Sequence, residues 1–166
     1  MKVVKKQTNS RMCVICGVEN HAGLQAPFYE MEDHSVMTIF EFKEHHQSYP
    51  GRAHGGLIST MLDEIVGRAI WIDEPLMWGV TMDISVKFRK PVPLNTSLIA
   101  KGIITKNTSK FFVGVGYIYD MHGNLLAEAK VNYFKLPIEK ISDTATHEDI
   151  NFLIEDDVKE INFIDK

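Results

Sequence analysis

The spacing of apolar residues divides this chain into one long helix and a series of strands. Between residues 56 and 72, pairs of apolar side chains recur at every fourth position, which predicts a helix with a broad buried stripe. Strands at 28–32 and 34–42 are expected to form a hairpin ahead of the helix. After it, apolar segments bounded by turn residues predict strands at 79–89, 97–106, 111–120 and 125–135.

The first strand after the helix has the clearest alternation. Its apolar residues are Val80, Met82, Ile84, Val86 and Phe88, and each alternates with a polar neighbour. Strict alternation predicts one buried face and one polar face, with Thr81 on the polar face. Residues 120–124 carry a turn signal, so the second half of the chain is expected to be an antiparallel meander. One helix and about six strands bury each other only if the sheet curls around the helix, which predicts an α+β domain with a wrapped central helix.

Length and charge favour a single domain followed by an acidic tail. The chain has 166 residues, 45% of them hydrophobic, which suits one globular core. Residues 138–166 carry nine acidic and three basic side chains, whereas residues 1–137 carry 13 acidic and 15 basic. We therefore expect a domain over 1–137 and an acidic extension over 138–166. Residues 43–53 are expected to be an exposed loop.

The charge pattern also narrows the class of partner. A body close to neutrality has no basic stripe for duplex nucleic acid, although one or two phosphate groups remain possible ligands. No apolar run approaches the roughly 18 residues that span a bilayer, so no membrane insertion is expected. The first residues lack the apolar centre of a secretory signal, which favours a cytoplasmic location.

Two cysteines and several histidines raise the question of a metal. Cys13 and Cys16 form a Cys-x-x-Cys pair, and His21 follows five positions later. A closed zinc site needs four ligands and a second such pair is absent, so we predict a knuckle turn with two free thiols and no metal. Ligands shared between two copies of the chain stay open as the alternative. His45 and His46 are expected on the loop surface.

Three segments carry a resemblance to a known family. They read CVICGVENHAGL, HHQSYPGRAHGGLISTMLDE and TMDISVKFRKPVPL, in that order. Over residues 13–137 the chain resembles the hotdog-fold acyl-CoA thioesterases, in particular their PaaI-like branch. The resemblance implies an antiparallel sheet wrapped around a long helix and a homodimer that joins two sheets edge to edge. It also implies hydrolysis of an acyl-CoA to a carboxylic acid and free CoA, in which coenzyme A is part of the substrate and no separate cofactor is needed.

Thioester hydrolysis needs a group that stabilises the oxyanion and a group that activates water or attacks the carbonyl. The backbone amide of Gly56, at the positive end of the predicted helix, is the expected oxyanion donor, and Gly55 permits the tight entry. Asp63 is the expected general base or nucleophile. Glu64 is the weaker candidate, because it stands four residues before Arg68, a spacing that suits a surface ion pair.

Other residues are assigned supporting roles. The resemblance implies that Thr81 helps to hold the attacking water. His54 is expected to orient the glycine pair, Gln47 to contact the thioester or the glycines, and Thr60 to line the open helix face beside the substrate. The basic residues at the end of the same strand are candidates for the CoA phosphates, and they are Lys87, Arg89 and Lys90.

The spacing of the two main groups predicts a shared site. Seven residues of helix separate Gly56 from Asp63 by roughly 10 Å, too far for one carbonyl to touch both. Two antiparallel helices across a two-fold axis would bring Gly56 of one chain to Asp63 of the other. We therefore expect two sites per homodimer and an inactive monomer. Whether the assembly is a dimer or a dimer of dimers stays open.

Two other functions stay open at this point. A non-catalytic acyl-CoA binding or sensing module is possible on the same fold, because a fold does not determine activity. A dehydratase acting on a hydroxyacyl thioester would need a differently placed histidine and carboxylate. The acyl group itself is undetermined, since pocket length depends on how residues such as Met61, Ile65 and Met82 pack.

Overall fold

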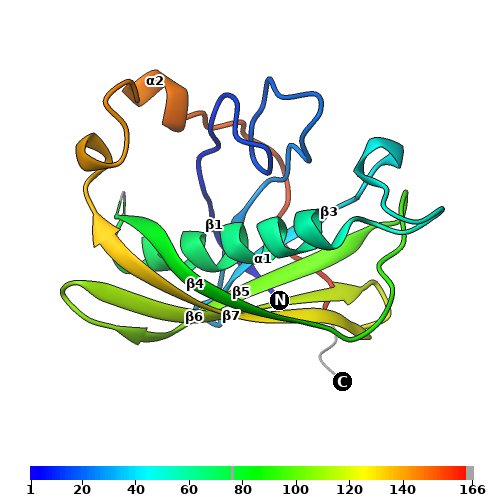
Figure 1. Ribbon diagram of the computed structural model, residues 1–166. Helices are drawn as coiled ribbons and strands as arrows, with labels where there is room; N and C mark the ends of the chain where they lie inside the picture. The colour runs from blue at the N-terminus through cyan, green and yellow to red at the C-terminus, as the bar shows by residue number, and fades with distance from the viewer. Residues whose placement is uncertain (76, 164–166) are drawn as a thin grey trace.

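A computed structural model describes residues 1–75 and 77–163, in which one antiparallel sheet holds a long helix (Figure 1). The helix α1 runs from Gly55 to Ala69 and continues as a 3₁₀ turn, η2, over Ile70–Ile72. The strands are β1 (Val3–Lys6), β2 (Tyr29–Met31), β3 (Val36–Phe40), β4 (Trp78–Phe88), β5 (Leu98–Asn107), β6 (Phe111–Asp120) and β7 (Leu125–Leu136). Short helical turns lie at η1 (Glu44–His46), η3 (Ile138–Lys140) and α2 (His147–Ile150).

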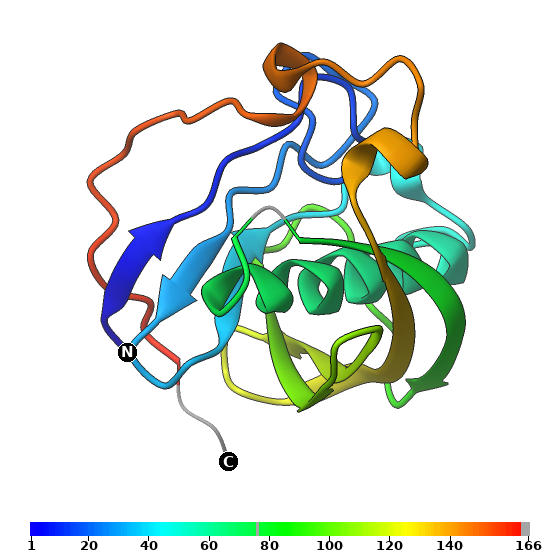
Figure 2. The same cartoon turned by 90° about the vertical axis from the view of Figure 1, so that its left-hand side faces the viewer.

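The sheet curls around α1, as Figure 2 shows, and this confirms the predicted α+β architecture. The strand order is β1-β2-β3-β5-β6-β7-β4. The predicted meander is therefore correct for β5, β6 and β7 and wrong for β4, which pairs with β7 at the far edge instead of with β5. After β4 the chain crosses over to β5 beside β3, and this crossover lets the sheet cover α1 from both sides.

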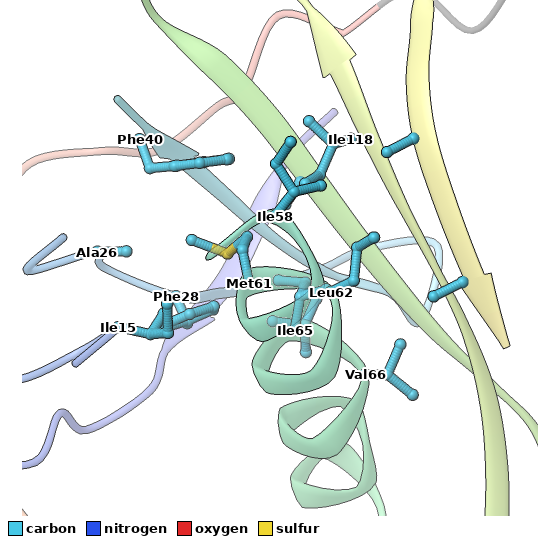
Figure 3. Packing of buried hydrophobic residues seen from close by; sticks show 14 of the residues in the cluster. Ile15, Ala26, Phe28, Phe40, Ile58, Met61, Leu62, Ile65, Val66 and Ile118 are labelled. Carbon is cyan, nitrogen blue, oxygen red and sulfur yellow. The ribbon is translucent and has the colours of Figure 1, made fainter. Parts of the chain in front are cut away.

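The core lies between α1 and the concave face of the sheet (Figure 3). The helix presents Ile58, Met61, Leu62, Ile65 and Val66, all buried, toward the strands and the N-terminal segment. Glycines in β5 and β6 permit the close approach. A Cβ added to Gly102 would lie 2.3 Å from the Ile65 carbonyl oxygen, and one added to Gly116 would lie 2.8 Å from a Val66 methyl group. The helix is thus held by one face, which leaves the face that carries Asp63 free of the sheet centre.

A β-bulge in β4 changes which way its side chains point. Thr81 pairs with Tyr133 and Asp83 with the adjacent Asn132, so Met82 is the extra residue. Thr81 contacts α1, and Val86, five positions later, packs on the same side against the core. Without a bulge, residues an odd number apart would point to opposite faces. The prediction that Thr81 lies on the face opposite Val86 is therefore wrong.

The loop before α1 is exposed as expected, except at His46 and Ala53. His46 is only 4% exposed. Its Nδ1 accepts a hydrogen bond from the Lys43 amide at 2.9 Å, and its Nε2 donates to the Ala22 carbonyl at 2.9 Å. The prediction of a surface position is correct for His45 and wrong for His46, because the hydrogen bonds to Lys43 and Ala22 turn the ring inward.

The acidic tail returns to the N-terminal strand instead of projecting away (Figure 2). Backbone hydrogen bonds join Val3 to Lys159, Asn9 to Phe152 and Ile161 to Met1, and the Ile161 side chain is fully buried. The boundary at residue 137 stays a prediction. No helix in the described part of the chain is both long and apolar enough to cross a membrane.

Candidate active site

A cavity of about 200 Å³ opens on the free face of α1. Its wall combines residues of the helix with β4, β7 and the N-terminal segment, and the side chains used below are Cys13, Asp63, Glu64, Arg68, Thr81 and Tyr133. The indole rings of Trp71 and Trp78, 5.0 Å apart between ring centroids, form an apolar part of the same wall. Carboxylates, hydroxyls and one thiol therefore converge on a space that is partly apolar, which is the character of a ligand site.

Asp63 is held in place by two hydroxyl groups. The Thr81 hydroxyl donates to Asp63 Oδ1 at 2.9 Å and reaches Oδ2 at 3.2 Å. The Tyr133 hydroxyl lies 2.6 Å from the Asp63 carbonyl oxygen and 3.0 Å from Oδ1. Oδ1 thus accepts the stronger bonds, while Oδ2 keeps most of its capacity for another donor such as water. The bulge in β4 is what aims Thr81 at this carboxylate.

Burial dominates the electrostatics of Asp63. Desolvation raises the pKa of its carboxyl above the usual value, and the hydrogen bonds from Thr81 and Tyr133 lower it in part. The charge of neighbouring Glu64 raises it further. Burial also raises the pKa of the Tyr133 phenol, with the Asp63 charge as the next cause, so this hydroxyl stays protonated and remains a donor. The carboxylate is therefore a stronger base than that of an exposed aspartate.

Tyr133 is the residue of this group that the sequence did not reveal. It is a buried aromatic residue on β7, and its position in an alternating strand is that of an ordinary core residue. Its ring stacks on Phe112 with centroids 4.5 Å apart, which fixes the direction of the hydroxyl. Only the pairing of β7 with β4 places it opposite Thr81. No signal in the sequence marks that pairing.

The start of α1 is capped by a histidine side chain. His54 is the N-cap residue, and its Nδ1 accepts a hydrogen bond from the Gly56 amide at 3.0 Å. Among the described residues, the Gly55 amide has no hydrogen-bond partner. The Ser59 and Thr60 hydroxyls donate back to the carbonyls of Gly55 and Gly56, at 2.9 and 2.8 Å. The glycine pair thus lies at an exposed helix start, where amides are available for an anion.

Gly55, Gly56 and His54 do not line the cavity that holds Asp63. Within one chain, the helix start and the carboxylate are seven residues apart on the same helix. The two halves of the expected site therefore stay separate in one copy of the chain. The seven-residue spacing of Gly56 and Asp63 predicts this separation within one chain.

The other expected binding residues are spread along the surface. Gln47 accepts a hydrogen bond from the Gly51 amide at 2.9 Å, so it braces its own loop. Arg89 and Lys87 both pair with Glu128, at 2.6 and 3.8 Å. Within the described ranges, Lys90 has no ion pair and is exposed. The structure thus keeps the three basic residues near one end of β4 but neutralises two of them in part.

Glu64 and Arg68 form the expected ion pair, but not at the surface. Arg68 Nε donates to Glu64 Oε1 at 2.7 Å, and Arg68 is only 5% exposed. Its guanidinium lies 4.3 Å from the centre of the Phe28 ring and donates to the Thr8 carbonyl. The predicted pairing is confirmed and its surface position is wrong, because the N-terminal segment folds over this part of α1.

A comparison with protein families finds a match over the central part of the chain. Residues 50–127 match the model of the Thioesterase superfamily. This range contains α1, β4, β5, β6 and the beginning of β7, together with Asp63 and Thr81. This part of the chain is therefore similar to the Thioesterase superfamily.

An individual relative points in the same direction. The mouse protein acyl-coenzyme A thioesterase THEM4 is 28% identical over 116 residues, which cover 69% of this chain and 49% of the relative. This chain thus spans about half the length of that curated relative.

Among solved structures, a thioesterase superfamily protein matches with a TM-score of 0.68 at 23% identity, over 74% of this chain and 63% of the other. A Streptococcus mutans protein bound to acetyl CoA matches with a TM-score of 0.60 at 23% identity, over 68% and 89% of the two chains. These likenesses confirm the predicted hotdog fold, while the PaaI-like branch stays a prediction.

Proposed function

We propose that this protein hydrolyses an acyl-CoA thioester to a carboxylic acid and free CoA. The observation that carries the proposal is the half-buried Asp63 carboxylate, held by the Thr81 and Tyr133 hydroxyls on the wall of a cavity. The family match and the relative named as an acyl-coenzyme A thioesterase support the same chemistry. The structural neighbour bound to acetyl CoA supports CoA as the carrier of the acyl group.

The hydrogen bonds around Asp63 favour the role of general base. Because both hydroxyls lie within hydrogen-bond distance of Oδ1, Oδ2 is the oxygen that would take a proton from water. The hydroxide so formed adds to the thioester carbonyl carbon, and the tetrahedral intermediate then expels the CoA thiolate, which receives the proton from Asp63. Thr81 would contact the same water from the strand side.

The helix start is the proposed oxyanion site. The Gly56 amide now donates to His54 Nδ1, so a thioester oxygen at this amide would replace the imidazole as acceptor. The neighbouring Gly55 amide would be the second donor, and the helix dipole favours the negative charge that develops there. In this proposal His54 holds the glycine turn in the free enzyme and Thr60 stiffens it.

A second copy of the chain would complete the site. β4 lies at an edge of the sheet and exposes large apolar side chains, including Met82 at 57% and Phe88 at 56% exposure. An apolar edge strand of eleven residues is a template for pairing with another strand. Pairing of β4 with its copy would join two sheets edge to edge and set the two α1 helices side by side, so that each Asp63 would face the partner's helix start. The basic residues near the end of β4, of which Lys90 has the most freedom, would then lie near the CoA phosphates.

The proposal is tested by free CoA thiol released from a panel of short, medium, long and aromatic acyl-CoAs. We expect turnover that is saturable and strongest for one acyl class. Saturable binding of acyl-CoA without thiol release would instead favour the non-catalytic binding module. If acyl-CoA is neither bound nor hydrolysed, acyl-CoA is excluded as the ligand class.

The pH dependence of the reaction should report Asp63. Because its pKa is raised, the reactive carboxylate accumulates at higher pH than for an exposed aspartate, and kcat/KM should fall as pH drops through that pKa. Thr81→Val removes a hydrogen bond that lowers this pKa, so the acid limb should move to higher pH. Thr105→Val, which removes a surface hydroxyl bonded to Val113, should leave the profile unchanged. An acid limb that does not move in Thr81→Val would assign the titration to another group.

A further inference from the structure

We propose that Cys13, Cys16 and Glu64 form a binding site for one thiophilic divalent cation, Zn²⁺ being the best match, at the edge of the cavity. The two Sγ atoms and a Glu64 carboxylate oxygen all lie within 4.8 Å of one another. Both cysteines are free thiols in the structure. The third ligand comes from α1, fifty-one positions after Cys13, and only the fold brings it to the cysteine pair.

The turn around the cysteines has the hydrogen bonds of a metal-binding knuckle. The amides of Ile15 and Cys16 point at Cys13 Sγ at 3.4 and 3.5 Å, and the Ser10 amide points at Cys16 Sγ at 3.4 Å. Amides aimed at sulfur stabilise negative charge on it, as hydrogen bonds to the sulfurs do in metal–thiolate centres. These amides would therefore stabilise both sulfurs as thiolates once a cation displaces the thiol protons.

Gly17 closes this turn at a point where no side chain fits. Its amide donates to the Cys13 carbonyl at 2.8 Å, and a Cβ added to it would lie 2.3 Å from that oxygen. The glycine thus holds the two cysteines in a tight loop. A pair of thiols in a loose surface segment would not need such a constraint.

The third ligand is already close to coordination distance. Cys13 Sγ lies 3.9 Å from Glu64 Oε2. In a tetrahedral site with Zn–S near 2.3 Å and Zn–O near 2.0 Å, the two atoms would be about 3.5 Å apart. Small side-chain rotations bring them to that separation. Glu64 Oε1 remains bonded to Arg68, which orients the carboxylate from outside the metal site.

Charge balance favours a dication at this position. The buried Arg68 neutralises Glu64 when the two thiols are protonated. Replacing the two thiol protons by one M²⁺ leaves the net charge of the cluster unchanged, so metal binding adds no uncompensated charge. Arg68 also keeps its place over Phe28 and needs no rearrangement.

The cavity provides room for the fourth ligand. Cys13 and Glu64 both line it, so water can complete a site with three protein ligands. The sequence alone counted two cysteine ligands and favoured a turn without metal, because Glu64 lies far away along the chain. The expected role of the ion is to anchor residues 10–17 to α1, and so to stabilise one wall of the cavity.

The test is metal binding by the purified full chain, with zinc and cobalt salts as the probes. After incubation under reducing conditions and gel filtration, we expect about one zinc per chain and two thiols protected from a thiol reagent. Co²⁺ should give the charge-transfer absorption of cobalt–thiolate bonds. Zinc lost on filtration, with both thiols still reactive, would overturn the proposal. A mass lower by two hydrogens would show a disulfide instead and would equally overturn it.

Variants distinguish a specific site with three protein ligands from non-specific zinc binding by two thiols. Cys16→Ser should abolish the retention of zinc. Glu64→Gln should weaken zinc binding by more than about tenfold, because it removes a direct ligand and not a residue that only orients one. Glu19→Gln is the matched control, because Glu19 is an exposed carboxylate on the same segment. Equal affinity of the two glutamate variants would exclude Glu64 as a ligand. If Cys16→Ser does not fold, the number of zinc ions retained per wild-type chain tests the proposal by itself. None of these measurements depends on hydrolytic activity.

Discussion

Asp63→Asn is expected to lower kcat for acyl-CoA hydrolysis by about 100- to 10,000-fold, the range in which a general base contributes. An asparagine keeps the shape of the side chain and an oxygen that accepts from Thr81 and Tyr133, but it cannot take a proton from water. KM should change little, because the substitution removes a group that acts in the transition state rather than one that binds CoA. The measurement is steady-state release of CoA thiol.

Asp73→Asn is the matched control for this substitution. Asp73 follows the same helix and is exposed, and its carboxylate pairs with the exposed His34 side chain at 3.0 Å, so kcat should stay at the wild-type value. Melting temperatures of both variants close to that of the wild type would show that the loss is chemical. Activity that survives in Asp63→Asn but disappears in Glu64→Gln would move the role of the base to Glu64.

Mixing two inactive variants is expected to restore about a quarter of the wild-type activity, if each site takes its two halves from different chains. The variants are Asp63→Asn, without the base, and Gly56→Pro, without the proposed oxyanion amide. Proline is tolerated in the first turn of a helix, so α1 should still form. After subunit exchange, half of the dimers are mixed, and each mixed dimer has one site with both groups intact.

A second mixture gives the opposite result and serves as the control. When wild type is exchanged with an equal amount of the Asp63→Asn, Gly56→Pro double variant, both sites of every mixed dimer lack one group. At equal total protein concentration, activity should then be about a quarter of that of wild type alone, because only the wild-type homodimers are active. If each site were built within one chain, about half of the activity would remain. Failure of the first mixture to recover activity, with exchange verified by native mass spectrometry, would place both halves of the site in one chain.

Periodicity was sufficient to predict α1 and the strands β2 to β7, whereas the short strand β1 (Val3–Lys6) was not predicted. The apolar pairs that recur every fourth residue predicted α1 within one residue of its start, because one side of that helix faces the sheet along its whole length. The later strands were predicted to within one residue at each end, because turn residues bound each of them. The sequence also proposed Asp63 and Gly56 as the reactive groups, since hydrolysis of a thioester needs a proton acceptor and a donor to the oxyanion. Their roles stay predictions.

Long-range pairing decided the rest of the site. Local spacing carries no information on which strand lies beside which, so the pairing of β4 with β7, and with it the role of Tyr133, appeared only in the fold. The bulge at Met82 reverses the face on which Thr81 lies, and a two-residue alternation cannot reveal it.

The position of Glu64 shows the same limit. Its spacing from Arg68 predicted an ion pair correctly, because neighbours on one helix turn are determined by local geometry. Its approach to Cys13, and the burial of Arg68, depend on the N-terminal segment folding over α1. The sequence thus determined the helix and the strands β2 to β7, since these follow from local periodicity, and it proposed the two principal reactive groups from their chemistry. The tertiary structure alone decided what surrounds those groups, because contacts between distant segments depend on how the whole sheet closes around the helix.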